Sequence, residues 1–146
     1  MSEKVLVVDA TNQVLGRMCS IIAKRLLEGY RVHVVNAEKA RVSGDKQSFI
    51  REYVKFLDIK SVRNPKHTPR HPRNPATYVR SVIKGMLPMD KKKGTDAFRR
   101  LRVYIGNPGN LKGQIVRFEE ADASRLGRRS FALCELKSIF KVPEVS

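Results

Sequence analysis

Two histidines, His67 and His71, lie four residues apart, a spacing that on a helix would place both imidazoles on one face to bind a metal such as zinc. A proline lies between them and another follows directly, so the helix that this spacing requires cannot form. The segment 61–89 contains no acidic residue that could act as a third ligand or as a general base. We therefore expect no metal site here, and we interpret the two histidines as groups that hydrogen-bond phosphate or stack on a nucleobase.

Asp9 is the next residue whose position could support chemistry, because it ends a short apolar run and α/β proteins often place functional groups at the carboxyl ends of strands. The sequence offers it no partner general acid, and the following turn matches neither G-x-G-x-x-G nor the Walker lysine motif. We interpret Asp9 and this turn as capping the next helix, with Thr11 or Asn12 as the cap. The start of that helix could still hold one RNA phosphate.

The two cysteines, Cys19 and Cys134, fall in apolar surroundings, so we expect small core side chains rather than nucleophiles. Their wide separation gives neither a disulfide framework nor a zinc set, which is typical of a reduced, cytoplasmic protein. The longest apolar runs are four residues, too short for a membrane helix or a signal peptide. We predict no enzymatic activity, no catalytic residue, no cofactor, no small-molecule substrate and no membrane partner.

The composition favours a different chemistry, the neutralisation of a polyanion. The 146 residues include 30 Lys or Arg and 14 Asp or Glu, a formal net charge of +16. Residues 61–102 alone hold 12 basic and 2 acidic side chains, so most of the excess lies in the middle of the chain. Such a concentration of basic side chains is typical of proteins that bind the phosphate backbone of a nucleic acid. The alternative is a cationic surface that serves only solubility. We favour it less, because added acidic residues increase solubility more than added basic residues do.

The segment 61–75 is the most unusual part of this basic region. It contains four prolines among its basic and histidine side chains, and its one apolar residue is Val62. Proline prevents a regular helix or a central strand, and the segment has too few apolar side chains for a core. We predict an extended basic arm, which loses less conformational entropy on binding because proline already restricts it.

These basic segments must be positioned by a core, and the apolar pattern predicts a single domain over residues 1–146. Short β-branched runs predict strands at 5–8 and 32–35, and a helical period predicts a helix over 14–28 between them. A strand, a crossover helix and a second strand imply a parallel pair with a right-handed connection. A third strand is predicted at 103–105.

Two further helices are predicted from their start signals. Asp45 can cap a helix, and its expected buried stripe is Phe49, Ile50, Tyr53, Val54 and Leu57. Asn74 followed by Pro75 combines a capping side chain with proline at the first helical position. The expected inner stripe of this second helix is Val79, Val82, Ile83 and Met86.

The rest of the chain has weaker patterns. Gly94 and Thr95 are predicted to open a short helix, residues 114–118 are strand-like, and apolar residues over 133–140 suggest a final short helix.

The candidate RNA-binding residues are the cations and histidines that these elements leave outside the predicted core. In the arm they are Arg63, Lys66, His67, Arg70, His71 and Arg73. After the arm they are Arg80, Lys84, Lys91, Lys92, Lys93, Arg99, Arg100 and Arg102. Arg17, which lies with Lys24 on the polar side of the first helix, completes the set. Spread over a loop, helix faces and a lysine-rich turn, these cations favour recognition of RNA shape over a DNA-reading helix.

Several short motifs resemble a known family. In the first half they are Val8-Asp9-Ala10, Leu15-Gly16-Arg17, Val35-Asn36-Ala37-Glu38 and Val42-Ser43-Gly44. In the second half they are Arg80, Lys84-Gly85-Met86-Leu87-Pro88, Gly94 and Leu101-Arg102-Val103-Tyr104-Ile105-Gly106. In this order and spacing the chain resembles the large-subunit ribosomal protein L-thirteen family, in its archaeal and eukaryotic branch.

The resemblance implies an α/β fold with three layers, α/β/α, around a mostly parallel four-stranded sheet, carrying a basic extended arm. It also implies a structural constituent of the large subunit of the cytoplasmic ribosome, with large-subunit ribosomal RNA and neighbouring ribosomal proteins as partners and a role in assembly and stability. Two other functions remain open at this point. One is an RNA-processing or nucleotide-dependent enzyme that uses Asp9, and the other is a module that binds acidic proteins.

Overall fold

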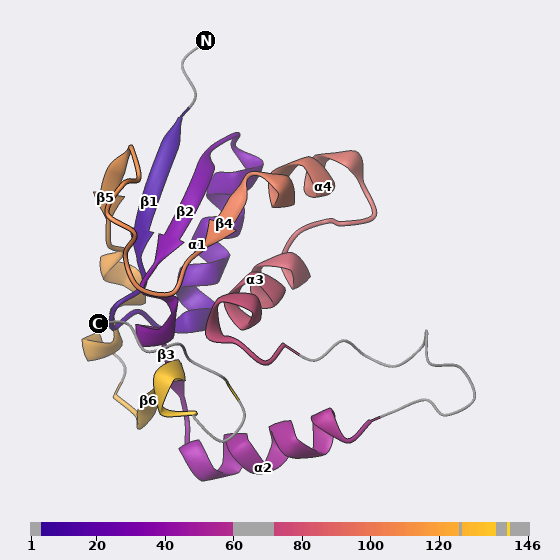
Figure 1. Cartoon of the computed structure of the whole chain (residues 1–146), viewed down its shortest axis with the longest axis vertical. Helices are drawn as coiled ribbons and strands as arrows, with labels where there is room; N and C mark the ends of the chain where they lie inside the picture. Colours follow the sequence, from indigo (N-terminus) through magenta and orange to yellow (C-terminus); the bar gives the residue numbers. More distant parts are fainter. Residues whose placement is uncertain (1–3, 60–71, 126, 137–139, 141–146) are drawn as a thin grey trace.

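Figure 1 shows the computed structural model, which describes residues 4–59, 72–125, 127–136 and 140. Its centre is a sheet of four parallel strands in the order β4-β2-β1-β5. The strands are β1 (Val5–Asp9), β2 (Arg31–Val35), β4 (Leu101–Val103) and β5 (Gln114–Val116). The predicted α/β fold with a mostly parallel four-stranded sheet is confirmed.

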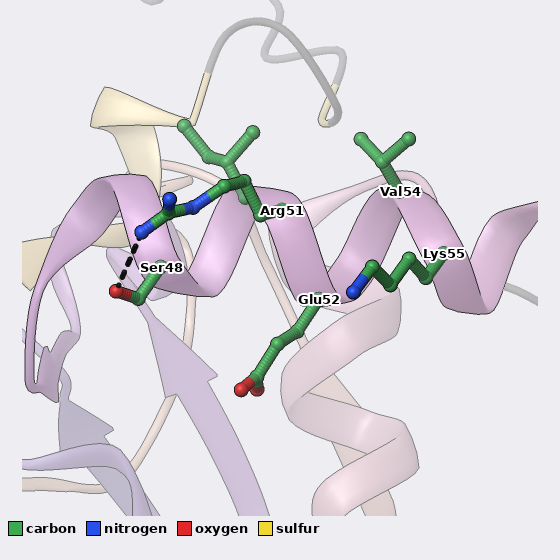
Figure 2. Close-up of a pocket in the computed structure, with 6 residues that line it drawn as sticks. Ser48, Arg51, Glu52, Val54 and Lys55 are labelled. Atoms are coloured by element: carbon green, nitrogen blue, oxygen red, sulfur yellow. Dashed lines mark hydrogen bonds between the residues drawn. The ribbon is translucent and has the colours of Figure 1, made fainter.

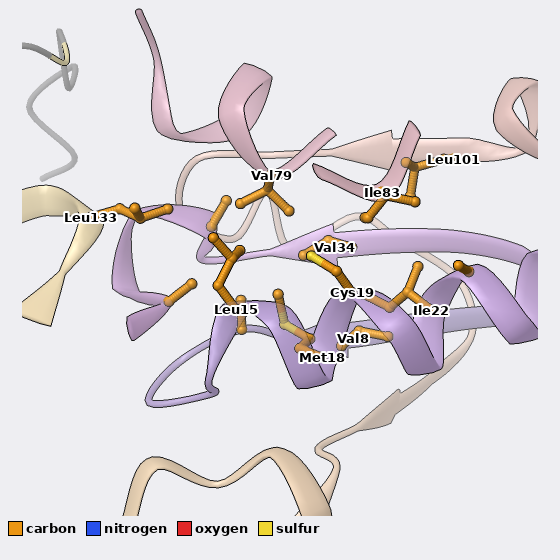
Figure 3. Close-up of a cluster of buried hydrophobic side chains, with 14 of the residues drawn as sticks. Val8, Leu15, Met18, Cys19, Ile22, Val34, Val79, Ile83, Leu101 and Leu133 are labelled. Carbon is orange, nitrogen blue, oxygen red and sulfur yellow. The ribbon is translucent and has the colours of Figure 1, made fainter. Parts of the chain in front are cut away.

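The predicted crossover unit is also confirmed. Helix α1 (Leu15–Leu27) connects β1 to β2, and Gly29, with a φ of 102°, follows its end in a conformation that glycine adopts readily. The side chains of Leu15, Met18, Cys19, Ile22 and Leu26 are buried as predicted. Figure 3 shows part of this row beside Val8 and Val34 of the sheet and Val79 and Ile83 of α3, so α1, α3 and the sheet together form the centre of the core.

Helices α2 (Lys46–Leu57) and α3 (Pro75–Gly85) start where their caps predict. The Asp45 side chain accepts a hydrogen bond from the Ser48 N–H at 3.3 Å, and the Asn74 side chain accepts one from the Ala76 N–H at 2.8 Å. Both side chains satisfy an N–H group that has no partner inside the helix.

Helix α4 (Lys92–Arg99) begins two residues before the predicted start, so that prediction is wrong at its boundary. Gly94 lies inside α4 and does not open it. The backbone of Pro88 approaches this position so closely that any side chain there would clash with it. The earlier start brings Lys92 and Lys93 into the first helical turn.

Two predicted core stripes are wrong at one position each. Val54 of α2 and Met86 after α3 are both 42% exposed. Helix α2 is held mainly through Tyr53, whose ring lies 5.4 Å from that of Phe140 and 6.0 Å from that of Tyr78, so only a narrow line of the helix is covered. Met86 is the C-cap of α3, where the helical period no longer applies.

A second, two-stranded antiparallel sheet was not predicted. It pairs β3 (Arg41–Ser43) with β6 (Ser130–Ala132), and it is too short for a sequence pattern to reveal. The third strand of the main sheet lies two residues before its predicted position, because Leu101 is fully buried opposite Val32. The strand-like segment 114–118 is confirmed over its first three residues, which form β5, whereas residues 117–118 lie outside the strand.

Single 3₁₀ turns account for much of what remains. They are η1 (Ala37–Lys39), η3 (Glu119–Ala121), η4 (Ala123–Arg125) and η5 (Leu133–Glu135). The predicted final helix over 133–140 is represented by η5, and residues 137–139 lie outside the described part. Across the described ranges, no helix has both the length and the apolar character needed to cross a bilayer.

Candidate nucleic-acid interface

Helices α3 and α4 carry six exposed cations, which we call the α3–α4 cation surface: Arg80, Lys84, Lys91, Lys92, Lys93 and Arg99. Arg80 and Lys84 lie one turn apart on the outer face of α3, as predicted from the helical period. Figure 1 shows α4 leading directly into β4, so this surface flanks the β4 edge of the sheet.

Phe98 of α4 positions the two cations of α3. The Arg80 guanidinium carbon lies 4.6 Å from the centroid of the Phe98 ring, and the Lys84 Nζ lies 6.0 Å from it. A cation over the face of an aromatic ring is attracted by the ring quadrupole, and the charged group keeps its donors available to a ligand. Both cations were predicted from the sequence, whereas the role of Phe98, which holds them beside α4, was not.

The start of α4 adds to the positive potential. Lys92 and Lys93 lie in its first turn, which contains no acidic residue. The first N–H groups of a helix carry a partial positive charge, so a phosphate placed there would meet both backbone dipoles and lysine charges. The nearest acidic partner on this helix is Asp96, whose carboxylate lies 4.0 Å from Arg99 in a pair that is largely exposed. Such a pair contributes little and leaves Arg99 able to contact a ligand.

Arg100 differs from its neighbour Arg99. Its Nη2 donates a hydrogen bond to the carbonyl oxygen of Leu26 at 2.6 Å, and its Nε is buried without a hydrogen-bond partner among the described atoms. The guanidinium therefore satisfies a carbonyl group in the last turn of α1, where a cation also complements the helix dipole. This geometry makes Arg100 a structural residue, and we do not include it in the α3–α4 cation surface.

We expect Arg100→Ala to lower the free energy of unfolding by about 1–2 kcal/mol, because the Leu26 carbonyl loses a charged donor. Arg99→Ala should leave stability almost unchanged, since its only described pairing is exposed. Urea unfolding of the two variants measures the difference. Equal stability of both variants would contradict the structural role of Arg100.

Arg102 lies on the opposite face of the sheet from the core side chains Val32 and Leu101, since side chains alternate along a strand. It is paired in register with His33, whose ring stacks on Tyr104 with centroids 5.9 Å apart. Partial burial, together with the charges of Arg31 and Arg102, lowers the pKa of His33. Arg102 is exposed and contributes positive charge to this sheet face rather than to the α3–α4 cation surface.

Most predicted residues of the arm lie outside the described part of the chain: Arg63, Lys66, His67, Arg70 and His71. Arg73 is described and exposed immediately before the Asn74 cap of α3. The Tyr53 hydroxyl donates a hydrogen bond to the Pro72 carbonyl oxygen, and burial is the main cause that raises the pKa of Tyr53 to about 12, so it remains a donor at neutral pH. The end of the arm is therefore fixed where the chain enters α3.

The described residues include no arrangement that favours catalysis. Although partial burial raises the pKa of Asp9, hydrogen bonds from the Thr11 N–H at 3.0 Å and from the Asn36 side chain at 3.1 Å prevail and lower it overall. The carboxylate thus joins two turns. The predicted cap at Thr11 or Asn12 is wrong, because the N-cap of α1 is Val14, which makes no side-chain cap. Among the described residues no three of His, Cys, Asp and Glu lie together as a metal site.

Cys19 is also unsuited to catalysis. It is fully buried, and burial raises the pKa of its thiol to about 12, so the thiolate that would act as a nucleophile is not formed at neutral pH. The prediction of a small core side chain is confirmed for Cys19, whereas Cys134, in the 3₁₀ turn η5, is only partly buried and lies outside the core cluster.

A cavity of about 540 Å³ lies along α2, and its described lining residues are Ser48, Ile50, Arg51, Glu52, Val54 and Lys55. Figure 2 shows these side chains on the helix. All of these described lining residues belong to one helix, and Arg51 donates a hydrogen bond to the Ser48 hydroxyl at 3.2 Å. The described lining thus lacks polar groups converging from several elements, as a small-molecule site requires.

The fold and these surfaces define a small, strongly basic α/β protein whose described polar groups form cationic surfaces rather than a catalytic cluster. Residues 3–110 match the family model described as ribosomal protein L13. The chain is 42% identical over 139 residues to the large ribosomal subunit protein uL13 of Sulfolobus acidocaldarius, covering 94% of this chain and 93% of that protein. It is 47% identical over 123 residues to uL13 of Aeropyrum pernix, covering 83% and 79%. The chain belongs to the ribosomal protein L13 family.

Proposed function

We propose that this chain is a structural constituent of the large ribosomal subunit in the cytoplasm, where it binds large-subunit ribosomal RNA and supports its assembly and stability. Its relatives are named large ribosomal subunit proteins, and the family is the first support for the proposal. The observation that carries the assignment of residues is the arrangement of Arg80 and Lys84 over Phe98, next to the lysine-rich start of α4.

The mechanism is electrostatic and breaks no covalent bond. Folded RNA brings phosphates close together, and their repulsion is reduced when fixed cations replace mobile counterions. Arginine takes a phosphate through two parallel N–H donors, whereas lysine acts as a point charge. The α3–α4 cation surface supplies both kinds of donor on two helices that the core holds in place. Arg73, the described cation of the arm immediately before α3, adds to the same contact.

The proposal is tested by measuring binding of the full chain to protein-free large-subunit and small-subunit ribosomal RNA over a range of salt concentrations. We expect a preference for the large-subunit RNA, and we expect log affinity to fall with log salt by about 0.7–0.9 for each phosphate contacted. Equal affinity for the two RNAs at every salt concentration would contradict the proposal, because nonspecific attraction alone would then explain the binding.

A further inference from the structure

A pocket of about 480 Å³ lies at the N-terminal end of α1, where three segments far apart in the sequence meet. Its described lining residues are Val14, Arg17, Ser43, Arg125, Gly127 and Arg128. Three of the six are arginines, and no acidic residue is among them. The pocket thus combines the end of β3, the end of η4 and the first turn of α1 around a concentrated positive charge.

Two of the three guanidinium groups have no competing partner. Within the described ranges, the side chains of Arg17 and Arg128 form neither a hydrogen bond nor an ion pair, and both are exposed. Arg41 in the adjoining strand β3 provides the contrast, because its Nε and Nη2 both donate at 2.9 Å to Ser130. The guanidinium of Arg41 is thus occupied by hydrogen bonds within the protein, whereas those of Arg17 and Arg128 can still donate hydrogen bonds to a ligand.

Arg125 has a weaker internal interaction. Hydrogen bonds from Ser124 are the main cause that lowers the pKa of the Asp122 carboxyl, and the charges of Arg117 and Arg125 lower it further. Asp122 does not line the pocket. Arg125 therefore interacts electrostatically with the Asp122 carboxylate and also adds positive charge to the pocket that it lines.

The start of α1 adds to the same field. Its first turn contains no acidic residue, and its N-cap, Val14, makes no side-chain cap. A Cβ at Gly16 would meet no atom within 4 Å, so the backbone there is open to a ligand. The helix dipole reinforces the three arginines and does not by itself define the site.

We propose that this pocket binds a backbone phosphate of RNA, as a second contact separate from the α3–α4 cation surface. The inference rests on the proposed function for the identity of the RNA. The chemistry favours phosphate, because several arginine forks converge and none of the described lining residues is acidic. The two contacts lie toward opposite edges of the sheet, since α4 leads into β4 and η4 follows β5. RNA bound at both would span the domain.

Labelling with phenylglyoxal, an arginine reagent, tests the site residue by residue. The full chain is labelled alone and in complex with protein-free large-subunit ribosomal RNA, and modification is quantified by mass spectrometry. We expect RNA to protect Arg17 and Arg128 while Arg51 on α2, the control, stays reactive. Equal reactivity of Arg17 and Arg128 with and without RNA would overturn the inference, as would protection by polyglutamate but not by RNA.

A triple alanine variant of Arg17, Arg125 and Arg128 gives an independent readout. With three phosphate-facing cations removed, the slope of log affinity against log salt should become shallower by about 2. A control variant with Arg51, Lys55 and Lys112 replaced by alanine removes the same charge elsewhere and should keep the slope. Similar thermal midpoints of both variants establish that they are folded.

The outcomes separate the two claims. If the wild type prefers large-subunit RNA and the pocket variant has the same slope as the control variant, the pocket inference fails alone. If the wild type shows no preference for large-subunit RNA, the proposed function fails, and the inference fails with it.

Discussion

Replacing Arg80, Lys84, Lys92 and Lys93 together with alanine is expected to make the salt dependence of binding to large-subunit ribosomal RNA shallower by about 3 in the slope of log affinity against log salt. Each of these exposed cations is expected to displace roughly one counterion from a phosphate. Affinity at low salt should fall accordingly, whereas affinity at high salt should change less. Filter binding or fluorescence anisotropy over a salt series measures the slope.

A matched variant separates position from net charge. Lys39, Arg51, Lys55 and Lys112 are also exposed and lie outside the α3–α4 cation surface. Replacing these four with alanine removes the same charge, and we expect the slope to stay close to that of the wild type. If both variants showed the same loss of affinity and the same change in slope, net charge alone would explain the binding, and the α3–α4 cation surface would have no special role.

Gly94→Ala is expected to destabilise the fold by about 3 kcal/mol, the largest effect of a single methyl group that we predict for this chain. A Cβ at this position would lie 2.1 Å from the Pro88 carbonyl oxygen and 2.4 Å from its carbonyl carbon. Backbone atoms cannot rotate away as a side chain can, so either the connection from α3 or the start of α4 must shift. Thermal or urea unfolding measures the loss.

Gly85→Ala is the control for this substitution. Gly85 is the last residue of α3, and a Cβ there would meet no atom within 4 Å. Alanine in a helix is favoured over glycine by about 0.5–1 kcal/mol, so this variant should be as stable as the wild type or more so. Equal destabilisation of both variants would mean that the contact with Pro88 does not explain the requirement for glycine at position 94.

The elements with strong local signals were predictable from the sequence. The period of α1, the cap of α3 and the β-branched runs of β1 and β2 each depend on residues near one another in the chain. The pairing of β3 with β6 joins residues about 90 positions apart, as in the contact of Arg41 with Ser130. Strands of three residues have too little alternation to be recognised, so this small sheet could not be predicted.

The candidate site likewise contains residues that were predictable from the sequence and residues that were not. Exposed cations on α3 were predictable because helical periodicity separates Arg80 and Lys84 from the buried Val79 and Ile83. Sequence alone could not distinguish Arg99 from Arg100, since the difference is a single hydrogen bond to the distant Leu26 carbonyl. It also could not bring Arg125 and Arg128 to the start of α1, because the tail that carries them has little periodic pattern of its own.

In the proposed function, the outer face of α3 lies against large-subunit ribosomal RNA. Photo-crosslinking in intact cells tests it most directly, with a photoreactive amino acid placed at position 81, between Arg80 and Lys84 on the exposed face of α3, and at position 52 on α2 as the control. We expect crosslinks from position 81 to nucleotides of large-subunit ribosomal RNA, well above those from position 52. Crosslinks from position 81 to acidic protein alone, or to RNA outside the large subunit, would contradict it.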